Sequence, residues 1–386
     1  MDSPTNQPVE PSGSSSPSPA AKTPELARYV RAMIKAGASD LHIKPGMLPH
    51  IRVRTEISAA RAEPLSPEQT EAMAYELMSP KQRAFFEEQG SVDLAYELAG
   101  SDRFRVNAFR QRGKIAIAVR RVTREIPDFT ALHLPAILEK IADQHQGLVL
   151  LAGTAGSGKS TTVAAMLEHI NKTRRCHILT IEDPIEYLYE GKKSLISQRE
   201  IGIDVPDFEA GLRYLTREDP DVVLIGEMRD RETFQAGLQA SETGHLVLGT
   251  IHSSTSAQTI TRLLDLFPTD GRALIRQSLA FNLYAIVCQK LLPSVAKGVD
   301  RVPAVEVLLT NTIVQQLIEE ERDGEIPDLI RAHEGEGMQS FTRSLLDLIE
   351  RNLVDPRVAY EVAPNVDELK MLMKGITASR SSLLGR

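Results

Sequence analysis

The chain has 386 residues, of which 42% are hydrophobic and 25% are charged, and its formal net charge is -7. This length predicts two or three domains of ordinary globular composition, and no apolar run approaches the ~20 residues that a membrane-spanning helix requires. The N-terminus lacks a signal-type segment, and two cysteines cannot make a four-ligand zinc site by themselves. We therefore expect a cytoplasmic protein without zinc, and the mild acidity argues against nucleic acid as its partner.

The beginning of the chain is predicted to be a disordered tail, residues 1–23. The first 22 residues contain five prolines and six serines and almost no large apolar side chain. Such a segment cannot bury enough apolar surface to offset the entropy lost on ordering.

A small α+β domain is expected over residues 24–122. It opens with a helix that ends at Gly37, because apolar side chains recur on one helical face. Short strand-like runs follow, and then a helical stretch from Pro67 to Gln89. The apolar face of the first helix consists of Leu26, Tyr29, Val30, Met33 and Ile34.

The last part of this domain alternates like two strands joined by a turn at Gln111–Lys114. Between Arg103 and Arg124 lie eight Lys or Arg residues and no acidic residue. Three interpretations compete: a solvated basic face, a nucleic-acid patch, or a donor of arginine fingers to an active site.

A linker is expected over residues 123–131, followed by a larger domain over 132–372. In this second domain helical and strand-like pieces alternate, as is typical of a doubly wound α/β fold. Its end is rich in helices, and we expect residues 373–386 to be loose.

The most specific pattern in the chain is a phosphate-binding loop. The pattern G-x-x-x-x-G-K-[ST] is matched by Gly153, four further residues and then Gly158-Lys159-Ser160. This segment lies between an apolar strand and an amphipathic helix in the sequence. Glycines let the backbone N–H groups face phosphate oxygens at a helix N-terminus. Lys159 is then expected to neutralise the phosphates of ATP, and the Ser160 hydroxyl to ligate Mg²⁺. The expected nucleotide-binding residues here are Gly153, Thr154, Ala155, Gly156, Ser157, Gly158, Lys159, Ser160 and Thr161.

Three further apolar runs end in polar residues. The first leads into Glu182, Asp183 and Glu186; an acidic surface turn is the alternative interpretation. Ligands bind at the carboxyl ends of strands in such sheets, which favours a place for these carboxylates near the phosphates.

The second run, within DVVLIGEMRD, ends in Gly226-Glu227 where many P-loop NTPases have an aspartate that helps to hold the metal. The third has His245 just before it and His252 at its end, and we predict a role near the phosphates for both histidines.

Together these motifs resemble the secretion ATPases, and specifically the twitching-motility pilus-retraction motors (the PilT and PilU family). The resemblance covers nearly the whole chain beyond the tail. The motifs are ASDLHI at 38–43, FRVNAF, GTAGSGKSTT, ILTIEDPIEY, REDPDVVLIGEMRD, ETGHLVLGTIHS and GMQSF at 337–341.

The resemblance implies a RecA-like P-loop core, a small PAS-like α+β N-terminal domain and a helical C-terminal region. It implies that Glu227 holds Mg²⁺ through water and that Glu182, Asp183 and Glu186 form the family's aspartate box. Glu186 matches the acid that polarises the attacking water, although Glu186 and Glu227 could exchange these roles. His245 and His252 match the histidine box, which senses the γ-phosphate.

For the basic hairpin, the resemblance implies that Arg105, Arg112 and Arg120 reach a nucleotide at a subunit boundary, and hence a homo-hexameric ring. The implied function is ATP hydrolysis that drives pilus retraction, with an inner-membrane platform protein and a paralogous retraction ATPase as partners. The alternatives are an accessory ring subunit with weak or no turnover, and a pilus-extension or type II secretion motor.

Overall fold

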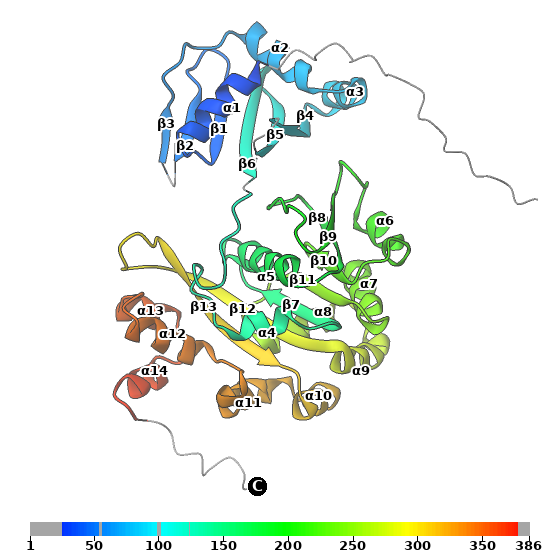
Figure 1. Ribbon diagram of the computed structural model, residues 1–386, viewed down its shortest axis with the longest axis vertical. Coiled ribbons are helices and arrows are strands. Elements are labelled where there is room, and N and C mark those ends of the chain that lie inside the picture. The colour runs from blue at the N-terminus through cyan, green and yellow to red at the C-terminus, as the bar shows by residue number, and fades with distance from the viewer. Residues whose placement is uncertain (1–24, 54–55, 99–101, 123, 377–386) are drawn as a thin grey trace, which may run out of the picture. The chain divides into compact units, whose positions relative to one another are not determined.

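The computed structural model describes residues 25–53, 56–98, 102–122 and 124–376. The tail predicted over 1–23 and residues 377–386 of the one predicted over 373–386 lie outside the described residues, and Met373 is the last residue of helix α14 (Val366–Met373). The chain divides into two compact units, Met1–Arg121 and Val122–Arg386 (Figure 1), and each is described here by itself.

In the described part of the first unit, six strands form one sheet in the order β3-β2-β1-β6-β5-β4. Three helices cover one face: α1 (Leu26–Lys35), α2 (Pro67–Leu77) and α3 (Pro80–Gln89). Side chains alternate along a strand, so β5 buries Phe104 and leaves Arg105 on the opposite face. The strands are β1 (Asp40–Ile43), β2 (His50–Val53), β3 (Glu56–Ala59), β4 (Ser91–Glu97), β5 (Arg103–Gln111) and β6 (Lys114–Val122).

The predicted turn between the last two strands of this unit is confirmed. Arg112 and Gly113 join β5 to β6, with φ angles of 51° and 73°. A two-residue turn with both φ angles positive matches the right-handed twist of the flanking strands. Arg112 therefore lies exposed at the tip of the hairpin.

The helical stretch predicted from Pro67 to Gln89 begins and ends at these residues, and the chain forms two helices there. Ser66 and Ser79 each cap a helix that has proline as its first residue. Each serine hydroxyl accepts a hydrogen bond from a backbone N–H three residues later, and the Gln there accepts one from the serine N–H. Because proline is disfavoured in a helix interior, this arrangement ends α2 and starts α3.

In the second unit, the strands within residues 124–376 form a seven-stranded sheet in the order β13-β12-β7-β11-β10-β8-β9. The pairs from β12 to β9 are parallel, and β13 is antiparallel at the edge. The strands are β7 (Gly147–Ala152), β8 (His177–Glu182), β9 (Leu195–Glu200), β10 (Val222–Ile225), β11 (Leu246–Ile251), β12 (Leu283–Pro293) and β13 (Arg301–Leu309).

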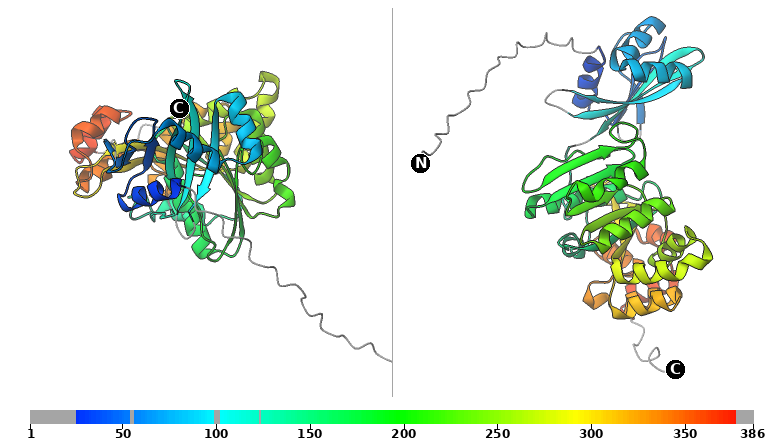
Figure 2. Two further views of the ribbon diagram at one scale, coloured as in Figure 1. Left: turned by 90° about the horizontal axis from the view of Figure 1, so that it is seen from above. Right: turned by 90° about the vertical axis from the view of Figure 1, so that its right-hand side faces the viewer.

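Both faces of this sheet are buried, which explains why its central strands are apolar throughout. On β7, Val149 and Leu151 face the core that α4 (Ile137–Ala142) and α5 (Lys159–Thr173) complete. Leu148 and Leu150 face a second core on the other side. The predicted doubly wound α/β fold is confirmed, with the helices layered on the sheet in Figure 2. The helices on the second side are α6 (Phe208–Arg213), α7 (Arg231–Glu242), α8 (Ser256–Asp265) and α9 (Arg272–Asn282).

The predicted helical C-terminal part gathers near the β12–β13 edge of the sheet (Figure 1). Its GMQSF segment is tied to β13, since Gln339 and Val307 exchange backbone hydrogen bonds of 2.8 and 3.0 Å. Met338 and Phe341 are buried in the core on the side of the sheet that Leu148 and Leu150 face. The helices of this part are α10 (Thr312–Glu319), α11 (Ile326–Ala332), α12 (Phe341–Glu350), α13 (Pro356–Val362) and α14 (Val366–Met373).

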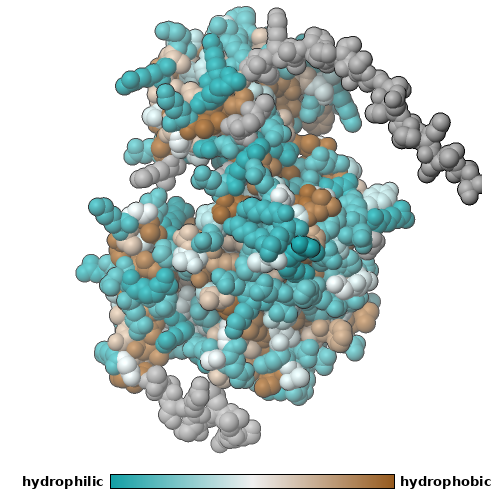
Figure 3. All heavy atoms as spheres, viewed as in Figure 1, coloured by the Kyte–Doolittle hydropathy of each residue, from teal (hydrophilic) through white to brown (hydrophobic). Residues whose placement is uncertain are grey.

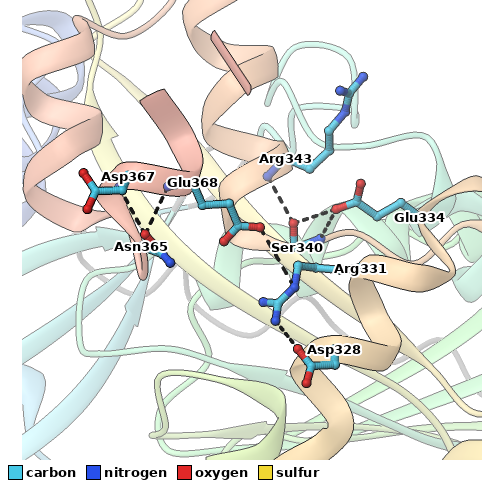
Figure 4. Close-up of polar contacts among 8 residues, drawn as sticks. All are labelled: Asp328, Arg331, Glu334, Ser340, Arg343, Asn365, Asp367 and Glu368. Carbon is cyan, nitrogen blue, oxygen red and sulfur yellow. Dashed lines mark hydrogen bonds and ion pairs between the residues drawn. The ribbon is translucent and has the colours of Figure 1, made fainter. Parts of the chain in front are cut away.

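Polar contacts connect these C-terminal helices to one another (Figure 4). Arg331 on α11 pairs with Asp328 one turn earlier and lies 3.9 Å from Glu368 on α14. The hydroxyl of Ser340, which caps α12, donates a 2.6 Å hydrogen bond to Glu334. The helices are therefore linked by side-chain contacts as well as by their shared apolar core.

None of the helices in the described ranges is long and apolar enough to span a bilayer. On the side of the second unit seen in Figure 3, hydrophobic side chains are interspersed among hydrophilic ones. Isolated exposed apolar side chains of this kind are normal on protein surfaces.

Candidate nucleotide site

A cavity of about 210 Å³ lies where four neighbouring parallel strands end. The phosphate-binding loop after β7 forms one wall, and residues that close or follow β8, β10 and β11 form the rest. The carboxyl ends of parallel strands meet at one edge of the sheet, which is where ligands bind in such folds. The lining residues that the sequence predicted are Ala155, Gly156, Lys159, Ser160, Glu182, Asp183, Glu186, Glu227 and His252.

Lys159 closes the phosphate-binding loop on itself. Its Nζ donates hydrogen bonds to the carbonyl oxygens of Gly153, at 2.7 Å, and Thr154, at 3.1 Å. Burial lowers the pKa of Lys159, and the nearby charge of Glu227 offsets part of this change. Because α5 begins at Lys159, the unpaired N–H groups and the positive dipole end of a helix lie at the cavity. This is the usual environment for a bound phosphate.

One polar atom of the loop is buried without a partner. Ser157 Oγ makes no hydrogen bond within the part of the chain that the structure describes. It lies so close to Gly153 that a Cβ at that position would be 2.3 Å away. A buried hydroxyl without a partner costs free energy. The features that fit a nucleotide are the glycine backbone of the loop and the N-terminus of α5.

Glu182, at the end of β8, is the most deeply buried carboxylate of the cavity. Burial raises its pKa to about 7, although hydrogen bonds from Thr180 and Gln198 act in the opposite direction. The Thr180 hydroxyl donates to Glu182 Oε1 at 2.7 Å. Glu186 and Asp183, by contrast, are exposed beside the cavity. Glu182 is therefore close to half-protonated at neutral pH, whereas the two exposed acids are accessible to water.

Glu227 follows β10 and lies between the side chains of Arg229 and His252. Arg229 Nη2 lies 2.6 Å from its Oε2, and His252 Nε2 lies 3.2 Å from its Oε1. Burial alone would raise the pKa of Glu227, but the hydrogen bond and charge of Arg229, with the charges of His252 and Lys159, lower it overall. The carboxylate is therefore held in its ionised form.

The lining of the cavity is compatible with Mg²⁺. The Ser160 hydroxyl and the Glu227 carboxylate both line it, and Mg²⁺ is usually bound by one or two protein oxygens together with phosphate oxygens and water. Among the described residues there is no cluster of three or more His, Cys, Asp or Glu side chains that could hold a metal ion. A bound metal would thus depend on the nucleotide for several of its ligands.

The structure separates the two predicted histidines. His252 lines the cavity, but His245 precedes β11 at its amino end, with Nδ1 2.8 Å from the carbonyl oxygen of Ala240. A strand of six residues, as β11 has, is ~20 Å long. Within one chain the prediction that His245 lies near the phosphates is therefore wrong, because only the carboxyl end of the strand reaches the site.

The three predicted finger arginines lie in the first unit, while the cavity is formed by the second. Arg105 is half-buried on β5 and Arg112 is exposed at the hairpin tip. Arg120 donates from Nε to Asp40 Oδ1 at 2.8 Å. This contact lowers the pKa of Asp40, whose burial alone would raise it. Arg120 thus has a carboxylate partner within its own unit.

Arg229 and Gln289, which the sequence patterns did not single out, contact residues of the site. Arg229 forms an ion pair with Glu227. The only indication of this contact in the sequence is that Arg229 follows Glu227 by two residues. Gln289, on β12, donates to the carbonyl oxygen of Ser157 at 2.7 Å and accepts from the Thr162 hydroxyl at 2.8 Å. A lone glutamine in an apolar strand gives no such signal in the sequence.

The fold and the cavity together define a P-loop ATPase with a RecA-like core. Residues 18–322 match the family model described as type II/IV secretion system protein. The chain therefore belongs to this family, and the predicted nucleotide-binding, ATP-hydrolysing class is confirmed.

Two curated relatives from Pseudomonas aeruginosa match nearly the whole chain. The type IV pilus retraction ATPase PilT is 40% identical over 329 residues, 85% of this chain and 95% of its own. The type IV pilus ATPase PilU is 37% identical over 350 residues, 91% of each chain. A crystal structure of the retraction motor PilT with bound ADP superposes with a TM-score of 0.82 at 42% identity, over 89% of this chain and 98% of that one. The predicted resemblance to the pilus-retraction motors is thereby confirmed.

Proposed function

We propose that this chain is a subunit of a homo-hexameric ATPase that drives type IV pilus retraction, and hence twitching motility. The observation that supports this most strongly is the near full-length similarity to PilT, including the structure with ADP, together with an intact cavity. The ring would act in the cytoplasm at the base of the pilus, against a platform protein of the inner membrane.

In this proposal the P-loop binds the phosphates of ATP and Lys159 balances their charge. Ser160, and Glu227 through water, would hold Mg²⁺, which supplies charge neutralisation at the β and γ phosphates. A carboxylate, Glu186 or Glu227, orients the attacking water, since positioning and charge stabilisation dominate phosphoryl transfer. His252, which contacts Glu227, would respond when the γ-phosphate leaves.

The arginines of the first unit complete the site from a neighbouring subunit. Arg105, Arg112 and Arg120 would reach a nucleotide bound at a subunit boundary, and such head-to-tail contacts close into a ring. Arg112 fits this role best in the single chain, because it is exposed at a hairpin tip. Hydrolysis would then shift the first unit of one subunit against the core of its neighbour.

A second candidate is an accessory ring subunit that works with a paralogous motor. The similarity to PilU over 91% of both chains favours it. The two candidates differ in turnover: the main motor hydrolyses ATP by itself, whereas the accessory ring shows weak or no turnover until the partner is added.

Deletion of the gene, with complementation by the wild type or by Lys159→Ala, tests the direction of the proposed motor. Loss of a retraction motor leaves assembly unopposed, so we expect more surface pili and no twitching in the deletion and in the Lys159→Ala strain. Fewer pili in the deletion strain would instead identify an extension or secretion motor.

A further inference from the structure

Gln289 lies beside the phosphate-binding loop because of the register between two strands. Parallel pairing places Cys288 of β12 next to Ala152, the last residue of β7. The next residue of β12 is Gln289, and the residue that follows β7 is Gly153 of the loop. Strand β12 therefore continues alongside the loop after β7 has ended. Gln289 is only 4% exposed.

Both polar atoms of the Gln289 amide are engaged, and their orientation follows from the partners. Nε2 donates to the Ser157 carbonyl oxygen at 2.7 Å, and Oε1 accepts from the Thr162 hydroxyl at 2.8 Å. A carbonyl oxygen can only accept, so the NH₂ group has to face Ser157. Thr162 lies in α5, so one side chain links the loop and the helix that follows it to β12.

The two outer glycines of the loop leave room for Gln289. A Cβ at Gly153 would lie 2.6 Å from the backbone carbonyl oxygen of Gln289. A Cβ at Gly158 would lie 2.6 Å from the side-chain Nε2 of Gln289. Gly158 also has a φ of 88°, which L side chains rarely adopt. The glycine spacing of the motif thus permits close contact with β12 in addition to contact with a nucleotide.

The bond to Ser157 determines the direction of the next N–H group. The carbonyl of Ser157 and the N–H of Gly158 belong to one planar trans peptide, in which they point in opposite directions. With the carbonyl held against Gln289, the N–H of Gly158 is turned away from the Gln289 amide. We propose that Gln289 is a positioning residue of the nucleotide site, which fixes the Ser157–Gly158 peptide so that its N–H group faces a phosphate oxygen.

Substitution of Gln289 by methionine provides the test, because methionine has a similar length and shape but neither donates nor accepts as an amide does. We expect Gln289→Met to weaken binding of fluorescently labelled ADP by about tenfold, the effect of one strong hydrogen bond to phosphate. The matched control is Gln339→Met, since Gln339 Nε2 likewise donates to a backbone oxygen at 2.8 Å, that of Val305 on β13. We expect the control to bind labelled ADP as the wild type does.

The titrations use the full-length assembled protein well below its unfolding temperature, with thermal unfolding measured in parallel. Unchanged affinity in Gln289→Met, or an equal loss in both variants, would overturn the proposal in favour of a purely structural role. If Gln289→Met does not fold, Thr162→Val is tested in its place, because it removes the hydrogen bond from the Thr162 hydroxyl that orients the Gln289 amide. We expect Thr162→Val to weaken binding of labelled ADP by about threefold, the effect of a partial loss of one such hydrogen bond. Unchanged affinity would again overturn the proposal.

This inference rests on the nucleotide binding in the proposed function, and the experiment separates the two. A folded wild-type protein that does not bind labelled ADP would refute the proposed function itself. A wild type that binds, with a Gln289→Met variant that binds equally well, would refute only the positioning role.

Discussion

His252 Nε2 lies 3.2 Å from Glu227 Oε1, so the residues that follow two neighbouring strands, β11 and β10, are in direct contact. The other carboxylate oxygen of Glu227 is held by Arg229. Both carboxylate oxygens of Glu227 therefore have a partner. Under the proposed function, a change at Glu227 on hydrolysis would reach His252 through this contact.

Glu227→Gln is expected to leave ATP bound but to lower its hydrolysis by about 100-fold or more, the usual loss when a group that acts on the transition state is removed. The shape of the side chain is kept, and only its charge is lost. Single-turnover hydrolysis and binding of labelled ATP measure the two effects separately. Glu232→Gln, on the exposed first turn of α7, is the control. A near-normal rate in Glu227→Gln would show that Glu186 suffices as the catalytic acid.

Glu182→Gln is expected to stabilise the protein at high pH. The folded-state pKa of Glu182, about 7, lies above its ordinary value of 4.5. The stability gained by its burial as a neutral acid is therefore complete below pH 4.5 and is lost as the pH rises through 7. Glutamine is neutral at every pH, so the gain at pH 8 is up to about 3 kcal/mol. Denaturant unfolding at pH 4.5 and pH 8 measures it; an equal effect at both pH values would contradict the buried-acid explanation.

His252→Ala and His245→Ala are expected to differ in nucleotide binding. His252 lies in the cavity and contacts Glu227, so its removal should weaken binding of labelled ATP by roughly three- to tenfold, the effect of one lost polar contact. His245 lies at the opposite end of β11, so His245→Ala should bind nucleotide as the wild type does. If His245→Ala weakens binding as much as His252→Ala, the placement of His245 away from the phosphates is contradicted.

Arg112→Ala is expected to lower ATP hydrolysis by the assembled ring by at least about tenfold, a conservative figure for an arginine finger. Lys114→Ala, two residues away on the same hairpin, removes one positive charge as well and should have little effect. Steady-state hydrolysis by both variants, with assembly checked by size, measures the difference. Equal rates in the two variants would support the interpretation of this hairpin as a solvated basic face.

The sequence predicted those parts of the fold that local patterns determine. Apolar runs such as Leu148–Leu151 indicated strands, and the P-loop pattern placed Lys159 and Ser160 at the start of a helix. The break at Ser79-Pro80 is also encoded locally, because a serine cap followed by proline starts α3. Local patterns of this kind need no knowledge of the tertiary fold.

The remaining parts of the site depend on strand direction and register, which the sequence does not display. The prediction for His245 assumed that both ends of a strand reach the site, whereas only its carboxyl end does. Gln289 contacts the P-loop because β12 pairs with β7 in one register, although Gln289 is far from the loop in the sequence. The contact between Arg229 and Glu227 depends on how the chain turns after β10.

Steady-state ATP hydrolysis by the purified, assembled protein tests the central claim most directly, with Lys159→Ala as the blank. Lys159 donates a hydrogen bond to the Gly153 carbonyl oxygen within the P-loop and is the residue expected to balance phosphate charge, so its removal should abolish turnover. We predict hydrolysis by the wild type well above this blank. A wild-type rate no higher than that of Lys159→Ala, in a well-formed ring, would contradict an autonomous motor.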